Sequence, residues 1–451
     1  MQTLFKSIMV VIVSMMVCVP AQADDFIQWV GNTSDDWMTA ANWSGNNVPD
    51  SLTEVAEVDA VGAYSTVLSS GNTIDVRDLW MADSWDPASH GELLIESGAS
   101  LSANSVSVNQ DSILNIEGEL VSRGIVWFNA ESVVTVSNDP AVTVEFDVTG
   151  SDINVQDDAS FSLYSDAKVK VDKFWCNDTS TVFVATSGVI EVSNGMYAKG
   201  ASTCQLNGSV SGSFKVEGNA TAIVDGSVSD WIEVSQNGVC TVNGDQTVSH
   251  VKASDNGQIV INGTINGPLQ IDSTNVLSRI GVNGVIHGDS GLGGSDYLTI
   301  AGTITNGVAN GVFSINGSAT VVIESTAKIY SASGNTWIYD TPSITWMVGE
   351  DGSVGTVWND SDSDGSYTDE VRYNGVPDDF NVDITAYKPE IHGDTLDVRL
   401  VGAIQDATTF ASNVTFWNDG VEHTDVSHLG SGLFRITNLY VPPAGTVISI
   451  Q

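Results

Sequence analysis

The sequence predicts an all-β protein, a parallel β-helix (solenoid) with an N-terminal cap and a small C-terminal β domain. Three observations predict this fold: a short strand motif that recurs about every 18 residues, a scarcity of proline around it, and an aromatic-rich segment before it. We expect the cap over residues 24–69, the solenoid over 70–340, and the C-terminal β domain or cap with an acidic loop over 341–451.

The recurring motif is a short strand that ends in Asn-Gly, Asp-Gly or a close variant. Its glycines are Gly208, Gly226, Gly244, Gly263, Gly284, Gly302 and Gly317, separated by 18, 18, 19, 21, 18 and 15 positions. A step of this size fits one solenoid coil, because a propeller blade needs about 40 residues or more. The residues two and four positions before each glycine are apolar and share one face of a strand, so both columns should point inward. We expect the Asn-Gly corners to use positive φ angles.

The proline distribution supports the limits of the solenoid. Between Ala88 and Thr341 only Pro140 and Pro268 occur, although the chain holds ten prolines. Proline cannot donate a hydrogen bond to a strand ladder, so long stacks of strands avoid it.

The repeat also predicts the state of two cysteines. Cys204 and Cys240 occupy the same inward column two coils apart, which places their Cα atoms roughly 10 Å from each other. Because a disulfide needs Cα atoms closer than about 7 Å, we expect buried free thiols.

Residues 1–23 have the pattern of a secretory signal peptide. Lys6 precedes an apolar stretch from Ile8 to Val19, and Ala21 and Ala23 form a cleavage site of small residues. About a dozen apolar residues are too few to span a bilayer. We therefore expect a secreted protein, extracellular or at the cell surface, without a transmembrane segment. The final residues, 441–451, lack an apolar helix followed by arginines, so we expect release or non-covalent attachment.

The chain is strongly acidic, with 56 Asp and Glu against 15 Lys and Arg. Loss of Lys6 with the signal peptide takes the formal charge from −41 to −42. This charge excludes a nucleic-acid partner, which requires a basic surface. It suits a saline exterior or one rich in divalent cations, and the alternative is that the acidity only confers solubility.

The segment before the solenoid is rich in tryptophan: Trp29 before Gly31, then Trp37, then Trp43 after Asn42, with Pro49 after Val48. This spacing resembles the N-terminal segment of bacterial secreted right-handed β-helix surface proteins, related to autotransporter passengers and to sorted surface proteins. The open end of a solenoid needs an aromatic cap, and stacking of a carbohydrate on Trp37 or Trp43 is the alternative.

An acidic loop after the solenoid predicts a calcium site. Its candidate ligands are Asp360, Asp362, Asp364, Ser366, Asp369 and Glu370. Carboxylates at alternate positions followed by a glycine wrap oxygen ligands around Ca²⁺ in loops of the EF-hand type. Position 12 of such a loop is Val371 rather than glutamate, and a solvated acidic linker is the alternative.

No catalytic motif stands out in the sequence. A lyase acting on uronates needs cations beside the substrate carboxylate, yet the only arginines between Ala88 and Asp340 are Arg123 and Arg279. We therefore favour a structural or adhesive surface or matrix protein, calcium-dependent and self-associating. A polysaccharide-binding or polysaccharide-degrading protein remains open, and clustered cations or exposed tryptophans on the solenoid would favour it.

Overall fold

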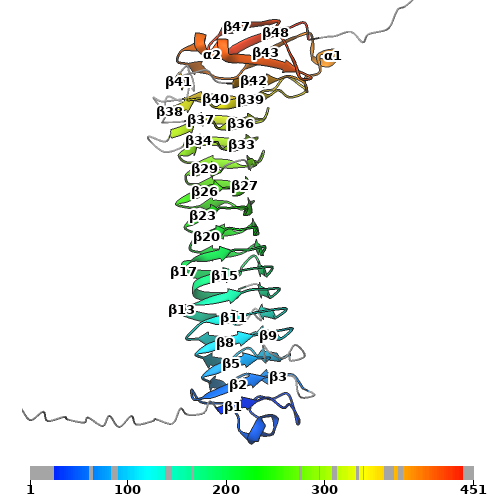
Figure 1. Cartoon of the computed structure of the whole chain (residues 1–451), viewed down its shortest axis with the longest axis vertical. Helices are drawn as coiled ribbons and strands as arrows, with labels where there is room; N and C mark the ends of the chain where they lie inside the picture. Colours follow the sequence, from blue (N-terminus) through cyan, green and yellow to red (C-terminus); the bar gives the residue numbers. More distant parts are fainter. Residues whose placement is uncertain are drawn as a thin grey trace, which may run out of the picture.

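The computed structural model describes residues 25–59, 64–82, 90–137, 145–164, 166–273, 277–293, 295–306, 312–331, 335–338, 340–359, 370–373 and 379–439. It shows a long parallel β-solenoid with a small antiparallel sheet at its C-terminal end (Figure 1). The predicted signal peptide lies outside the described residues.

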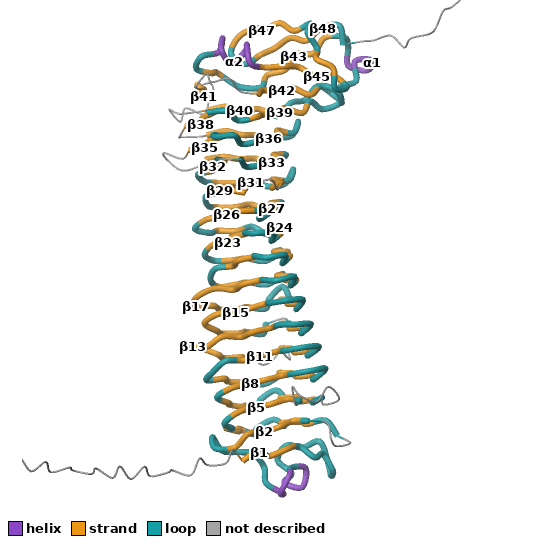
Figure 2. Tube along the Cα trace, viewed as in Figure 1, coloured by secondary structure: helices purple, strands orange, loops and turns teal. Residues whose placement is uncertain are grey.

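Each coil contributes strands to three parallel ladders, which form the sides of the column (Figure 2). Ladder 1 contains β1 (Asp25–Gln28), β2 (Glu54–Val58), β5 (Asp78–Met81), β8 (Ser105–Val108), β11 (Val126–Phe128), the second halves of β13 (Glu145–Val155), β15 (Lys168–Cys176) and β17 (Val189–Ala198), then β20 (Phe214–Val216), β23 (Trp231–Val234), β26 (His250–Asp255), β29 (Leu269–Ser273), β32 (Ser290–Leu292), β35 (Val312–Ile315), β38 (Asn335–Ile338), β41 (Glu370–Tyr373) and β44 (Ala403–Ile404).

Ladder 2 contains β3 (Thr66–Leu68), β6 (Glu92–Ile95), β9 (Ile113–Ile116), β12 (Val133–Val136), β14 (Ser160–Leu163), β16 (Thr181–Val184), β18 (Thr203–Leu206), β21 (Thr221–Val224), β24 (Val239–Val242), β27 (Gln258–Ile261), β30 (Leu277–Ile280), β33 (Tyr297–Ile300), β36 (Thr320–Ile323), β39 (Ser343–Met347), β42 (Asp379–Asp383) and β45 (Val414–Asn418).

Ladder 3 runs in two stretches. The first contains β4 (Thr73–Asp75), β7 (Ser100–Ala103), β10 (Glu119–Ser122), the first halves of β13, β15 and β17, β19 (Ser209–Ser211) and β22 (Ser227–Val228). The second contains β25 (Gln246–Thr247), β28 (Thr264–Asn266), β31 (Val285–His287), β34 (Thr303–Asn306), β37 (Lys328–Ser331) and β40 (Thr356–Asn359).

The parallel ladders extend beyond the predicted range of 70–340, because β1 and β2 already pair in parallel and β42 pairs in parallel with β45. At the C-terminal end, β48 (Leu433–Thr437) pairs antiparallel with β43 (Thr395–Arg399) and β47 (Val426–Gly430), and β46 (Val421–Glu422) folds back on β45. The helices are short: η1 (Ala40–Asn42), η2 (Ser44–Asn46), α1 (Pro389–His392) and α2 (Ala407–Asn413). No helix among the described residues has the length and apolar character needed to cross a membrane.

The predicted strand faces are confirmed except at Val282, which lies in a turn and is 60% exposed. The predicted role of the glycine corners is wrong. Gly317 alone of the seven motif glycines has a positive φ, of 67°. At the others the reason for glycine is close approach of the preceding coil: a Cβ on Gly226 would lie 1.7 Å from the carbonyl oxygen of Gly208, and one on Gly302 would lie 2.2 Å from that of Gly284. These corners therefore need the small size of glycine rather than its conformational freedom.

Among the non-glycine residues of the solenoid, positive φ angles occur mainly at a different corner, between ladders 1 and 2, with Asp166 between ladders 2 and 3 as an exception. A four-residue turn recurs there, whose second residue has positive φ, as at Gln110, Ala130, Asp157, Asp178 and Gln236. The fourth residue of the turn is small and is often buried, because it starts the next inward-facing column. The positive φ therefore falls at the corner that leads into each ladder 2 strand.

The core is one continuous stack of aliphatic side chains along the solenoid axis, with phenylalanines at intervals. Cys204 and Cys240 are buried and free, as predicted, and Cys176 is also buried and free. Cys204 lies opposite Ala222, which lies opposite Cys240, so the two cysteines are two coils apart.

We expect the folded chain lacking residues 1–23 to resist alkylation by iodoacetamide at pH 8. Burial raises the pKa of Cys240 to about 12, so its reactive thiolate is scarce, and the reagent has no access. Unfolded thiols ionise near pH 8.5, so Cys240 should make the free energy of unfolding fall as pH rises from about 8.5 towards 12. Intact-mass measurement should show three labels after unfolding in urea. Labels on the folded chain would contradict the assigned coil register.

Candidate functional site

The predicted calcium loop lies almost wholly outside the described residues. Asp360, Asp362, Asp364, Ser366 and Asp369 fall there, whereas Glu370, the first residue of β41, is exposed. Across the described part of the chain, no three His, Cys, Asp or Glu side chains gather where they could hold a metal ion. Calcium binding at this loop stays a prediction.

Trp29, Trp37 and Trp43, called here the tryptophan cap, close the N-terminal end of the solenoid. All three are at most 1% exposed, and their rings meet edge to face, with centroids 4.9 Å apart for Trp29 and Trp43 and 4.7 Å apart for Trp37 and Trp43. Each indole N–H donates to a backbone carbonyl, the shortest being from Trp43 Nε1 to Trp37 O at 2.6 Å. The capping interpretation therefore holds, because no ring face is available to a sugar.

A different set of aromatic side chains points outward from ladder 1. They lie in one row across six consecutive coils, called here the aromatic column. In coil order the row is Trp80, Ser107, Trp127, Asn154, Trp175 and Tyr197. The residues on either side of each aromatic member in its strand are buried, so these rings stand on the outer face of the sheet.

Large and small side chains alternate along most of the aromatic column. Trp80 is 40% exposed and Trp127 is 37% exposed, with Ser107 between them. Adjacent strands lie about 4.8 Å apart, so the indoles of every second coil lie about 10 Å apart along the column. Trp175 and Tyr197 are on adjacent coils and stack, with centroids 4.4 Å apart and planes 19° from parallel. The result is an extended aromatic strip on a flat sheet.

Charged side chains frame the upper end of this strip. Lys199 Nζ lies 4.6 Å from the ring centroid of Trp175 and 5.7 Å from that of Tyr197. It also pairs with Glu217 Oε1 at 2.5 Å, and Lys215 pairs with Glu217 Oε2 at 3.0 Å. Partial burial raises the pKa of Glu217, but the hydrogen bonds from Lys199 and Lys215 outweigh it and bring the pKa below its ordinary value. This cluster therefore stays ionised and fixed at neutral pH.

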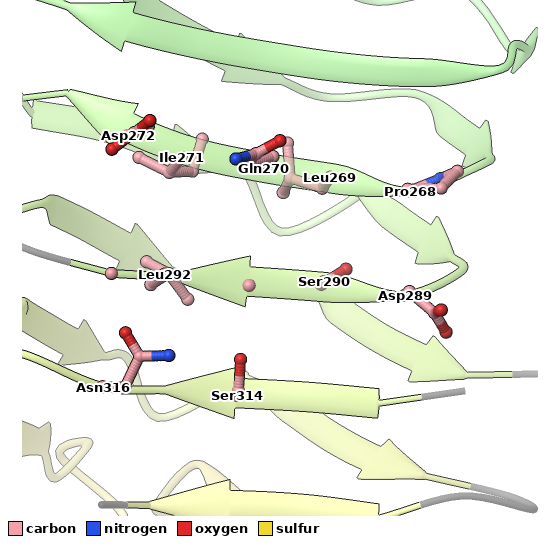
Figure 3. Close-up of a pocket in the computed structure, with 12 residues that line it drawn as sticks. Pro268, Leu269, Gln270, Ile271, Asp272, Asp289, Ser290, Leu292, Ser314 and Asn316 are labelled. Atoms are coloured by element: carbon pink, nitrogen blue, oxygen red, sulfur yellow. The ribbon is translucent and has the colours of Figure 1, made fainter. Parts of the chain in front are cut away.

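Beyond the charged cluster the same row opens into a shallow groove (Figure 3). Gln270, Gly291 and Ser314 follow one another on adjacent coils and line this groove, which has a volume of about 420 Å³. Trp337 is the next residue of the row, and the Arg372 guanidinium lies 4.6 Å from its ring centroid. Between Lys215 and this groove the row contains Glu233 and Lys252, so charged, polar and aromatic side chains follow one another along it.

The sequence holds a signal for the aromatic column that is independent of the 18-residue repeat. Each aromatic member sits between two apolar residues, as in the run from Leu79 to Met81 and the run from Val126 to Phe128. In a strand with period 2, the middle residue of such a run must face away from the core. An aromatic residue at that position indicates an outward ring.

The sequence matches no protein-family model, and comparisons with curated proteins and with solved structures find no similar chain. Function must therefore be inferred from the chemistry of the solenoid surface itself.

Proposed function

We propose that this chain is an extracellular adhesive protein that binds an extended polysaccharide along the outer face of ladder 1. It would belong with secreted β-helix proteins of the cell surface or matrix, as the resemblance of the N-terminal segment implies. The observation that carries the proposal is the aromatic column from Trp80 to Tyr197.

Aromatic rings suit this ligand because a pyranose has an apolar face of C–H groups and a rim of hydroxyls. Trp and Tyr offer large, rigid apolar surfaces together with a polar edge. The spacing of about 10 Å between Trp80 and Trp127 is comparable to one disaccharide unit of an extended 1,4-linked β-glycan. In such a chain every second sugar presents the same face, so successive indoles can each stack on an equivalent ring.

The charge distribution favours a neutral glycan over a polyanion. The chain as a whole carries a formal charge of −41, which repels an acidic polysaccharide. Lys199 and Lys215 beside the aromatic column are already paired with Glu217. These side chains can exchange hydrogen bonds with hydroxyl groups without a net charge on the ligand.

The test is retention on insoluble cellulose and chitin, together with calorimetric titration of soluble β-1,4 oligosaccharides. We expect wild type to bind at least one of these neutral glycans and Trp127→Ala to bind about tenfold more weakly, or about 1.4 kcal/mol. Tyr64→Ala is the matched control, because Tyr64 is 48% exposed but precedes β3 and lies outside ladder 1.

Three results would overturn the proposal. One is failure of wild type to bind any neutral glycan, and another is equal binding by wild type and Trp127→Ala. The third is release of reducing sugars from the polysaccharide, which would replace binding by a degrading activity.

A further inference from the structure

We infer that the outer face of ladder 2 is a self-association surface, on which a second copy of this chain packs side by side. This surface lies on a different side of the solenoid from the aromatic column, and it does not depend on glycan binding.

The outer face of ladder 2 is almost free of charge from β9 to β39. Its outward residues are, strand by strand, Ile113, Asn115, Val133, Thr135, Ser160, Ser162, Thr181, Phe183, Thr203, Gln205, Thr221, Ile223, Val239, Thr241, Gln258, Val260, Leu277, Arg279, Tyr297, Thr299, Thr320, Val322, Ser343 and Thr345. Arg279 is the one charged residue in this set, in a chain with 56 acidic residues. Acidic side chains are therefore kept off this surface along twelve strands.

The single charge is neutralised within the chain. Arg279 Nη2 pairs with Glu324 Oε1 at 2.9 Å. Thr299 lies in the strand between Arg279 and Val322, and it is only 6% exposed. The ion pair thus spans the Thr299 coil and leaves no net charge on the face.

Large apolar side chains stand exposed on this face. They are Ile113 at 38%, Val133 at 41%, Ile223 at 43%, Leu277 at 40% and Tyr297 at 36% exposure. Threonine and serine fill most of the remaining positions, which makes the surface flat and of mixed polarity. Ile113 and Val133 lie side by side on adjacent strands, as do Leu277 and Tyr297. Contiguous exposed apolar side chains of this kind mark an interaction surface.

At both edges of the central strands, asparagine side chains form hydrogen bonds from one coil to the next, so the edges are not lined only by carboxylates. On one edge, Asn237 Nδ2 donates to Asn219 Oδ1 at 3.1 Å. On the other, Asn262 Nδ2 donates to Asn243 Oδ1 at 2.9 Å, and Asn243 Nδ2 donates to Asp225 Oδ1 at 2.7 Å. A partner lying on β18 to β27 therefore meets mostly neutral hydrogen-bonding groups at the rim.

Charge and area both point to a second copy as the occupant. Each copy has a formal charge of −41, so two copies repel one another wherever their acidic surfaces meet. A side without net charge allows the two chains to approach closely. Twelve strands at about 4.8 Å and four residues at about 3.3 Å give roughly 700 Å² per copy. Stable interfaces bury about 600–1,000 Å² per partner, so two such faces, related by a two-fold axis, fall within this range.

The test is sedimentation velocity from about 1 to about 100 µM protein, at low salt and at about 0.5 M salt, where repulsion is screened beyond a few Å. We expect a dimer that strengthens with salt. Ile223→Asp should weaken it at least tenfold, because it places an unpaired carboxylate between the two paired faces. Ser211→Asp is the control, since Ser211 is exposed on ladder 3 of the same coil, and it should dimerise as wild type does. Circular dichroism should show that both variants keep the wild-type fold, as expected for outward positions.

A wild-type chain that stays monomeric at both salt concentrations would overturn the inference, as would an Ile223→Asp variant that dimerises as tightly as wild type. If Ile223→Asp instead abolishes glycan retention by a monomeric chain, ladder 2 is a ligand surface and self-association is excluded. Trp127→Ala should dimerise normally whether or not it has lost glycan binding, so the two proposals fail separately.

Discussion

Replacing Gly226 by alanine is expected to lower the free energy of unfolding by about 3 kcal/mol or more. The new Cβ would lie 1.7 Å from the carbonyl oxygen of Gly208 and 2.6 Å from its carbonyl carbon. Both atoms belong to the backbone of the adjacent coil, so relief requires two coils to separate. Separation would break the pairing of Val210 with Val228 and of Leu206 with Val224, which flank the contact.

The effect of Gly226→Ala should appear as a lower urea midpoint by circular dichroism and as faster amide exchange in β21 and β22. Ser227→Ala is the matched control, because Ser227 is the next residue in the chain and its side chain is exposed. This replacement should change the urea midpoint little. If Gly226→Ala unfolds at the wild-type midpoint, the coils do not approach one another at this corner as closely as the structure has them.

The repeat in the sequence predicts the solenoid because one coil must satisfy two independent constraints. The apolar columns at Leu206, Val224 and Val242 have the period of a strand within a coil and the period of about 18 residues between coils. Burial on one side of a sheet leaves few other registers. The parallel pairing and the free cysteines both follow from this register.

The corners and the functional surface follow less directly from the sequence. Asn-Gly has two physical uses, positive φ and close approach, and a dipeptide alone does not distinguish them; at Gly208 and Gly226 close approach prevails. The aromatic column depends on residues 20 or more positions apart, such as Trp80, Ser107 and Trp127, coming into register. Irregular coil lengths in this region hide that register until the ladders are known.

Replacing Trp37 by alanine is expected to cost about 3–5 kcal/mol, the range for truncating a buried tryptophan. Trp37 is fully buried, and its ring packs edge to face on Trp43 at 4.7 Å. A solenoid coil contacts only its neighbours, so a terminal coil depends on its cap. The loss should therefore appear first at the N-terminal end, as faster hydrogen exchange in β1, β2 and β5, while β21 and β24 keep their protection.

Trp80→Ala provides the comparison that separates capping from surface function. Trp80 lies in β5, near the cap, but its side chain is 40% exposed. Its ring packs edge to face on Phe26, with ring centroids 5.3 Å apart, and stays outside the core. We expect Trp80→Ala to change the free energy of unfolding by less than about 1 kcal/mol and to weaken glycan binding. Trp37→Ala should instead destabilise the N-terminal coils. If β1 and β2 of Trp37→Ala exchange their amide hydrogens at wild-type rates, the N-terminal coils are stable without Trp37. In that case the burial of three indoles at this end would need a reason other than capping.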